Sequence, residues 1–437
     1  MYSIRQQVIN IYNFVKKRIC LTSADCLVNV FTALCILLFA FFLFQNPLES
    51  IFPIFRYYDE VLLVLLVFLA VIKLISRCEP FPRGACLTIG LSILVVCIGV
   101  FGNINTGFQT NLEAIVKEII AFSKFPIGFA CASYLTSTFS SKDLIAKCDL
   151  VAKSFIILCS IFAAINFLIP DAGFGHDVRH GILSFKFIFT HPTFLVFSLV
   201  MSFVMMEAKK GGVSFFKVLC LILLATTMRD KAFGFVGFVI VSWVLNIGNK
   251  KNLFPYLFFA GVLVLVVAWP KISTYISYPN SPREALYSVA LSISLTFFPL
   301  GGGLASIASS LSGEYYSSAY SSYGIDSMIG LTRDGFYDVA DAGYAYYLGQ
   351  FGIIGLALFL LCLFIIFKMT VLKMPLGDSR RNASLCVFAY LFIALAVENA
   401  LTNSSGIIAA ILLTFICSGN NDFRPNSDFI EKKGSLL

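Results

Sequence analysis

Three arginines are the residues of this 437-residue chain best suited to binding an anion. Arg179, Arg229 and Arg283 each lie near a long apolar run, where a charge is costly unless an anionic group neutralises it. A planar guanidinium donates paired hydrogen bonds to phosphate oxygens, so three converging arginines would suit a lipid diphosphate at a membrane surface. The alternative is that each arginine anchors a helix end or pairs with a neighbouring carboxylate, namely Asp177, Asp230 or Glu284.

Candidate proton acceptors lie around a polar segment at 271–341, which interrupts a sequence otherwise made of apolar runs. Asp341 stands where the next apolar run begins, so it could simply cap a helix. It could also accept a proton from a sugar hydroxyl that attacks a lipid-linked anomeric carbon. Asp338 and Glu284 are the other carboxylates in reach by sequence position.

The same segment carries a tract of tyrosine and serine from Gly313 to Gly324. Tyrosine rings can stack on the apolar face of a sugar while hydroxyl groups bond the rest. The expected glycan-binding residues are Tyr315, Tyr316, Tyr320, Tyr323 and Tyr344. Such tracts are also typical of ordinary loops and of interfacial belts.

The scaffold that positions these residues must lie in lipid. The chain is 58% hydrophobic and 13% charged, with a mean hydropathy of +0.87, so a soluble core could not hide its apolar groups. It has no Gly-rich phosphate loop, no internal repeat and no soluble ATP-binding domain, which disfavours an ATP-driven pump. Its 13 cysteines form no CxxC pair, so they indicate packing rather than a disulfide framework or a metal site.

Apolar runs of about 17 to 25 residues are long enough to cross a bilayer as helices. The sequence predicts twelve, near 26–45, 60–76, 86–105, 111–135, 150–170, 186–206, 214–228, 231–248, 253–269, 342–367, 383–398 and 405–419. The expected fold class is therefore an all-α polytopic integral membrane protein with about twelve transmembrane helices and one large periplasmic loop.

Lysine and arginine set the orientation, because positive loops stay in the cytoplasm. Most of the 32 basic residues fall on one side if both termini are cytoplasmic, which places 271–341 outside. The net charge of +8 then reflects topology and anionic lipid rather than nucleic acid. The predicted division is an interfacial N-terminal helix at 1–25, a membrane bundle at 26–269, the large loop at 270–341, three further spans at 342–419 and a cytoplasmic tail at 420–437.

The order of these motifs resembles that of the O-antigen polymerase and ligase superfamily of bacterial membrane glycosyltransferases. The resemblance covers about 171–367, and no single motif carries it. The matching features are Arg179 in a short outer loop, Thr190-His-Pro-Thr193, Arg229 at a helix turn, Arg283 before Phe298-Pro-Leu-Gly-Gly-Gly303, and Asp341-Ala-Gly-Tyr344 leading into Gln350-Phe-Gly-Ile-Ile-Gly355.

This resemblance implies transfer of a glycan from undecaprenyl diphosphate at the periplasmic face of the bacterial inner membrane, without metal or cofactor. Ligases of the superfamily typically have a His-Asn pair where this chain has Asp341-Ala342, and 271–341 contains no histidine. The departure favours a polymerase, whose acceptor is another lipid-linked repeat unit, over a ligase that transfers to lipid A-core. The implied partners are undecaprenyl-diphosphate-linked oligosaccharides, with a chain-length regulator and a flippase in the same membrane.

A rival from another class is a secondary transporter or flippase of lipid-linked oligosaccharide. Transporters place ionisable residues near the bilayer centre or show repeated halves with broken helices. Here the ionisable residues inside the expected spans concentrate in one segment, where i, i+4 spacing would allow mutual pairing: Glu113, Lys117, Glu118 and Lys124. That distribution favours surface chemistry over passage, although Asn399, Asn403 and Gly406 between the last two spans would also fit a transporter.

Overall fold

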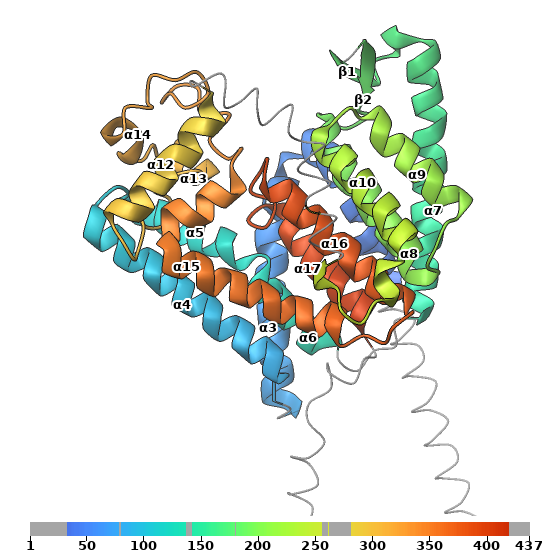
Figure 1. The fold of residues 1–437 in the computed structure, drawn as a ribbon, viewed down its shortest axis with the longest axis horizontal. Coiled ribbons are helices and arrows are strands. Elements are labelled where there is room, and N and C mark those ends of the chain that lie inside the picture. Colours follow the sequence, from blue (N-terminus) through green and yellow to red (C-terminus); the bar gives the residue numbers. More distant parts are fainter. Residues whose placement is uncertain are drawn as a thin grey trace, which may run out of the picture.

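The computed structural model describes residues 33–77, 80–136, 142–179, 181–255, 261 and 281–418, and these residues are mostly helical (Figure 1). The interfacial helix expected at 1–25, most of the span expected at 253–269 and the tail at 420–437 lie outside these residues.

Helices of the first half follow the expected apolar runs. They are Ala33–Leu43, α2 (Gln45–Ile51), η1 (Pro53–Tyr57), α3 (Tyr58–Arg77), α4 (Arg83–Thr106), α5 (Leu112–Ser123), α6 (Pro126–Thr136), α7 (Lys142–Leu168) and η2 (Pro170–Ala172). One difference is that the run 111–135 forms two helices, α5 and α6, separated at Lys124 and Phe125.

The second half continues in the same way. Its helices are α8 (Pro192–Lys209), α9 (Phe215–Thr226), α10 (Asp230–Leu245), η3 (Ile247–Asn249), α12 (Pro282–Thr296), α13 (Ser310–Glu314), α14 (Ala319–Ser322), α15 (Gly343–Phe367), η4 (Lys368–Leu372), α16 (Ser379–Leu395) and α17 (Ser404–Cys417). In α15 the backbone kinks at Gly352, which has φ 64° and ψ −169°.

Four of the described helices are long and apolar enough to cross a membrane: Arg83–Thr106, Asp143–Leu168, Pro192–Lys209 and Gly343–Leu372. The pair Ala33–Leu43 and Gln45–Ile51, bent by 72°, adds a fifth if it is one span. A helical membrane protein is thus supported, and the count of twelve spans stays a prediction.

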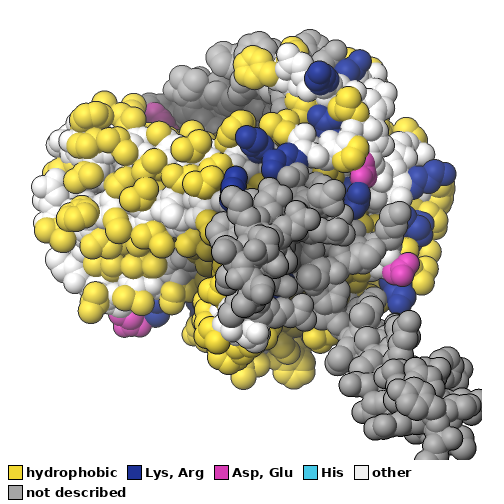
Figure 2. Space-filling model, turned by 90° about the horizontal axis from the view of Figure 1, so that it is seen from below, with side chains coloured by type: hydrophobic (Ala, Val, Ile, Leu, Met, Phe, Trp, Pro, Cys, Tyr) yellow, Lys and Arg dark blue, Asp and Glu magenta, His cyan; other side chains and the backbone are white. Residues whose placement is uncertain are grey.

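The helices pack into a bundle with an apolar exterior. α15 packs against α4 and α12, α8 packs against α7 and α16, and α17 packs against α6. Large hydrophobic side chains of α4 remain exposed, including Leu94, Phe101 and Ile104. Figure 2 shows hydrophobic side chains over the left of the molecule, with Lys and Arg mainly on the right. A face of this composition is suited to lipid.

A short β-hairpin departs from the all-helical expectation. Strands β1 (Gly175–Arg179) and β2 (Ile182–Phe185) pair antiparallel, and Gly181 in the turn has φ 79°. A hairpin turn favours glycine at such a positive φ. Figure 1 places the hairpin beside one end of α7 and α9. The hairpin fixes the backbone of Asp177 and Arg179, so both side chains leave a defined scaffold.

The segment expected as one large polar loop is partly buried. Every residue of 301–309 is buried, although its backbone is irregular. Buried side chains from α4 and α15 satisfy this backbone: Asn103 Oδ1 accepts from Leu304 N at 2.8 Å, and Gln350 Oε1 accepts from Ala305 N at 3.0 Å. Irregular backbone deep in a membrane protein requires such partners. This part of 270–341 belongs to the bundle interior.

Candidate functional site

Asp177 gathers two of the three predicted arginines. Its Oδ2 accepts from Arg179 Nε at 2.7 Å, and its Oδ1 accepts from Arg229 Nη2 at 2.8 Å. The Ser184 hydroxyl, across the hairpin, donates to Oδ1 at 2.5 Å. Burial acts to raise the pKa of Asp177, but the hydrogen bond from Ser184 and the two arginine charges outweigh it. The carboxyl pKa therefore lies well below its usual value.

Arg229 reaches this cluster from a tight turn between two helices. Thr227 ends α9, Met228 reverses the chain with φ 52°, and Arg229 is the N-cap residue of α10. Its side chain is only 8% exposed, and its Nε has no hydrogen-bond partner among the described residues. Burial, together with the charge of Arg179, lowers its pKa, although an arginine remains protonated. The site therefore holds a buried cation with a spare donor.

Two histidines complete the surroundings of Asp177. His176 Nδ1 lies 3.2 Å from Asp177 Oδ1, and the rings of His176 and His191 are 4.7 Å apart. His191 is the N-cap residue of α8, and its Nδ1 accepts from Thr193 N. Burial and the charge of Arg229 lower the pKa of His191 to about 4, so this ring is neutral at pH 7.

The third predicted arginine forms a separate pair with the predicted base. Arg283 Nη2 lies 2.9 Å from Asp341 Oδ2, and Arg283 Nε donates to the Asp341 carbonyl at 2.8 Å. Ser281 accepts from Glu284 N as the N-cap of α12, which sets Arg283 on the first turn of that helix. Burial raises the pKa of Asp341 and Arg283 opposes it, while Asp338 and Glu398 add to the rise.

The other two predicted carboxylates flank this pair. Asp338 is partly buried, its side chain packs close to Gly330, and burial raises its pKa against the charge of Arg283. Glu284 follows Arg283 on α12, and its Oε2 is buried with no hydrogen-bond partner among the described residues. The structure therefore places Asp341 and Asp338 near the cation of Arg283, and Glu284 follows that arginine in sequence.

Lys231 and Glu398, which the sequence analysis did not select, form a further ion pair. Lys231 Nζ lies 2.7 Å from Glu398 Oε1, and both side chains are largely buried. Lys231 stands two residues after Arg229 on α10, while Glu398 is close enough to Asp341 to raise its pKa. The signal that would have found them is a lone charge at the end of an apolar run, which requires a partner.

The tyrosine tract is less open than a glycan platform requires. Tyr320 is fully buried, stacks on Tyr316, and its hydroxyl lies 2.8 Å from Ser312 Oγ, so in this conformation its ring offers no exposed face to a sugar and its role in glycan binding stays a prediction. Tyr315 accepts from Lys117 Nζ at 2.6 Å. Tyr323 packs against Phe108 with ring centroids 6.2 Å apart.

Tyr316 and Tyr344 are partly exposed, but the hydroxyl of each already donates a hydrogen bond to a backbone carbonyl. Tyr316 donates to the Leu331 carbonyl at 3.0 Å, and Tyr344 donates to the Phe392 carbonyl at 2.9 Å. Tyr344 lies one turn from Asp341, at the start of α15. It is therefore the predicted tyrosine nearest in sequence to the charged pair.

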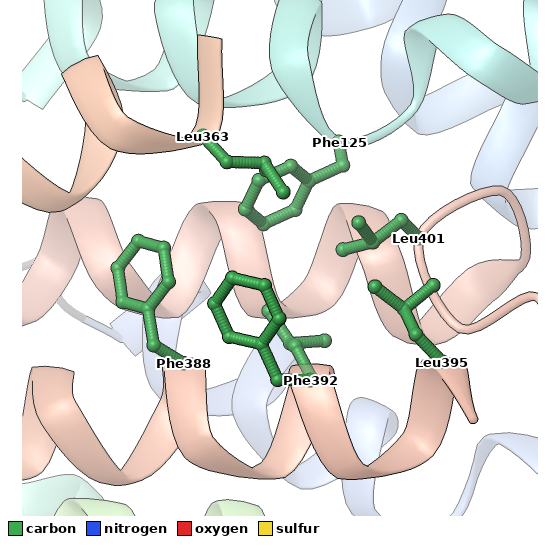
Figure 3. A pocket seen from close by; sticks show the side chains of 7 residues that line it. Phe125, Leu363, Phe388, Phe392, Leu395 and Leu401 are labelled. Carbon is green, nitrogen blue, oxygen red and sulfur yellow. The ribbon is translucent and has the colours of Figure 1, made fainter. Parts of the chain in front are cut away.

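A narrow apolar hollow lies between α15, α16, the α5–α6 break and the α16–α17 connection. Figure 3 shows six of its side chains pointing toward one another: Phe125, Leu363, Phe388, Phe392, Leu395 and Leu401. Leu391 completes the lining, which contains no charged or polar side chain. The hollow can hold only apolar atoms, so polar chemistry belongs to the charged clusters.

The expected ion pairing within 113–124 is correct for one pair only. Glu113 and Lys117 pair at 2.7 Å, whereas Glu118 is buried and accepts from Ser309 Oγ at 2.6 Å. Lys124, at the break between α5 and α6, pairs with Asp59 and Glu60 of α3 at 2.8 and 2.7 Å.

Comparisons with protein-family models and with curated proteins find no match to this chain. Within the part of the chain that the structure describes, no group of three His, Cys, Asp or Glu side chains could hold a metal ion.

Proposed function

We propose that this chain is a bacterial membrane glycosyltransferase that polymerises undecaprenyl-diphosphate-linked oligosaccharide repeat units. The proposed reaction takes place at the periplasmic face of the inner membrane, and the proposal requires the hairpin end of the bundle to face that side. The observation that carries the proposal is the convergence of Arg179 and Arg229 on one carboxylate, together with a buried Arg229 Nε that has no hydrogen-bond partner among the described residues. Such a cluster suits a diphosphate, which accepts several charge-assisted hydrogen bonds.

In the proposed reaction a hydroxyl of the incoming repeat attacks the anomeric carbon of the growing chain. A new carbon–oxygen glycosidic bond forms, and the bond from the anomeric carbon to the diphosphate oxygen breaks. Asp341 takes the hydroxyl proton, while Arg179, Arg229 and Arg283 neutralise the leaving diphosphate. In this scheme Arg283, which pairs with Asp341 in the structure, serves both the base and the leaving diphosphate. No metal or cofactor enters this scheme.

A ligase that uses lipid A-core as acceptor has the same donor chemistry, and only the absence of a histidine in 271–341 argues against it. A transporter or flippase of lipid-linked oligosaccharide is favoured by one observation. Lys124 and Asp59 form a buried ion pair between the α5–α6 break and α3, and the partly exposed Glu60 completes a charged triad. Ionisable groups in such positions often mark a transport path.

The first test is a gel of surface polysaccharide from a strain that lacks the gene, with lipid-linked glycans extracted alongside. A polymerase predicts glycan capped at a single repeat on its final carrier. Long chains stranded on undecaprenyl diphosphate would instead indicate a ligase, and an unchanged ladder would contradict both and favour the transporter.

The same strain supports a complementation test of the site. Asp341→Asn and Arg229→Gln should fail to restore the polymer, and Arg56→Gln is the matched control because Arg56 is exposed in η1, outside the site. Normal polymer from correctly inserted Asp341→Asn protein would remove the proposed role of Asp341.

A further inference from the structure

Asp177 occupies the position where an anionic ligand would receive the most donors. Its two carboxylate oxygens accept from Arg179, Arg229 and Ser184 at 2.5 to 2.8 Å, and His176 lies 3.2 Å away. These donor types and distances are those that proteins use for phosphate oxygens. The carboxylate therefore acts on these cations as a phosphate group would.

The fit of Asp177 to this position is incomplete. Arg229 Nε is buried and finds no hydrogen-bond partner in the part of the chain that the structure describes, although Nη2 of the same guanidinium contacts Asp177. His191 also has a donor to spare, because its Nδ1 accepts from Thr193 N and a neutral ring then carries its proton on Nε2. A buried unsatisfied donor costs about 1–3 kcal/mol, so an anion with more oxygens than a carboxylate would be favoured here.

We propose that Asp177 is an internal competitor that occupies the diphosphate site and is displaced when the diphosphate binds. The identity of the natural ligand, a lipid diphosphate, rests on the proposed function. The competition itself applies to any anion with the shape of a diphosphate. Arg179 and Arg229 exchange Asp177 for the ligand, and the ligand supplies an acceptor to Arg229 Nε. The ligand can bind only when Asp177 has left the arginines. The apparent affinity for the ligand is therefore reduced in proportion to the fraction of molecules in which the site is free. Asp177 thus keeps the paired arginines neutralised between reaction cycles.

The test measures binding of inorganic pyrophosphate to the purified full chain in nanodiscs of neutral lipid, by calorimetry and by thermal unfolding. Asp177→Asn keeps an acceptor for Ser184 and removes the competing charge, so we expect binding at least about tenfold tighter than in the wild type. The unliganded variant should unfold at a lower temperature, because two arginines lose their counter-ion, and pyrophosphate should restore it. Asp171→Asn is the matched control, since Asp171 is exposed in η2 and lies outside the cluster.

A second variant guards against misfolding of the first. Ser184→Ala removes the hydroxyl that donates to Asp177 Oδ1 and accepts from Asp177 N at 3.2 Å. Because both bonds hold Asp177 in place, this variant should also tighten pyrophosphate binding, by a smaller factor. Unchanged or weaker binding in both variants would overturn the competitor role and leave Asp177 as a residue that orients the arginines. Failure of pyrophosphate to bind the wild type and both variants would overturn the diphosphate site itself, and with it the proposed function.

Discussion

Arg229 is the residue on which the anion site depends most. It is the more buried of the two arginines on Asp177, and it carries the unsatisfied Nε. Removing a charge-assisted hydrogen bond to a ligand costs about 1.5–3 kcal/mol, so Arg229→Gln should slow glycan transfer roughly 10- to 150-fold. Arg229→Lys should recover only part of this, because an ammonium group cannot donate a paired fork.

Transfer can be measured with purified protein and a lipid-linked repeat, with Arg56→Gln as the charge-matched control. Full activity in Arg229→Gln would show that the arginine only stabilises the hairpin.

Asp341 should give the reaction an acidic limb in its pH profile. Burial raises the pKa of Asp341 above 3.8, and a base works only when deprotonated, so the rate should fall as the pH drops through that raised pKa. The charge of Arg283 lowers the same pKa. Arg283→Gln should therefore move the midpoint of the limb to higher pH, which a pH–rate profile would detect. A shift to lower pH, or an unchanged limb in Asp341→Asn, would rule Asp341 out as the base.

The arginines also show what sequence adjacency can and cannot predict. The expectation that each arginine pairs with a carboxylate close in sequence is correct for Arg179. It pairs with Asp177, because alternate residues of one strand point to the same face. For the other two, the pairs in the structure lie across the fold: Arg229 contacts Asp177 and Arg283 contacts Asp341. The sequence identified the charges that need partners, but their partners depend on tertiary packing, which periodicity does not encode.

At the level of elements, backbone hydrogen bonds join the Gly301–Gly303 turn, at the start of the buried irregular segment, to α15. Gly302 N and Gly303 N donate to the carbonyls of Gly349 and Gln350 at 2.7 and 2.9 Å, beside the kink at Gly352. Gly301 has φ +71°, and a Cβ there would lie 2.4 Å from Gly352 N. Gly301→Ala should therefore lower the free energy of unfolding by about 3 kcal/mol through backbone strain and overpacking. The measurement is the unfolding temperature in detergent, which should fall.

Gly90→Ala is the control, because its Cβ would meet nothing within 4 Å and alanine favours a helix. Equal stability of the two variants would mean that the close approach is relaxed in solution.

Lys124, at the break between α5 and α6, links this break to α3 through ion pairs with Asp59 and Glu60. Lys124→Met would leave Asp59 buried without its cation, which typically costs about 3–5 kcal/mol. We expect a large fall in unfolding temperature for Lys124→Met. Lys117→Met should change it little, since the Glu113–Lys117 pair is exposed. If Lys124→Met folds normally but abolishes activity, the triad serves function, and the transporter alternative gains support.

Apolar run length predicted where helices lie, and every expected run that the structure describes contains a helix. Run length alone could not predict the break at Lys124. The sequence signal for that break is Pro126, the first residue of α6, because proline has no backbone N–H to donate within a helix and disfavours helical backbone at the residue before it. Nor could run length predict burial of 301–309, since a Gly-Ser-rich stretch has the composition of a surface loop. Asn103 and Gln350 bury that segment by satisfying its backbone, which composition does not reveal.

At the level of the whole molecule, α8 orients the site. The Asp177 cluster precedes the start of α8, whereas Lys209 and Lys210 end it, and Lys217 follows on α9. Positive residues stay in the cytoplasm, so the hairpin should face the periplasm. Single cysteines at Val178 and Val213, each 68% exposed, lie at opposite ends of this helix.

A membrane-impermeant maleimide added to whole cells should label Val178→Cys and spare Val213→Cys, with the unsubstituted chain as the background control. Labelling of Val213→Cys alone would place the arginine cluster in the cytoplasm, where a periplasmic polymerase could not work.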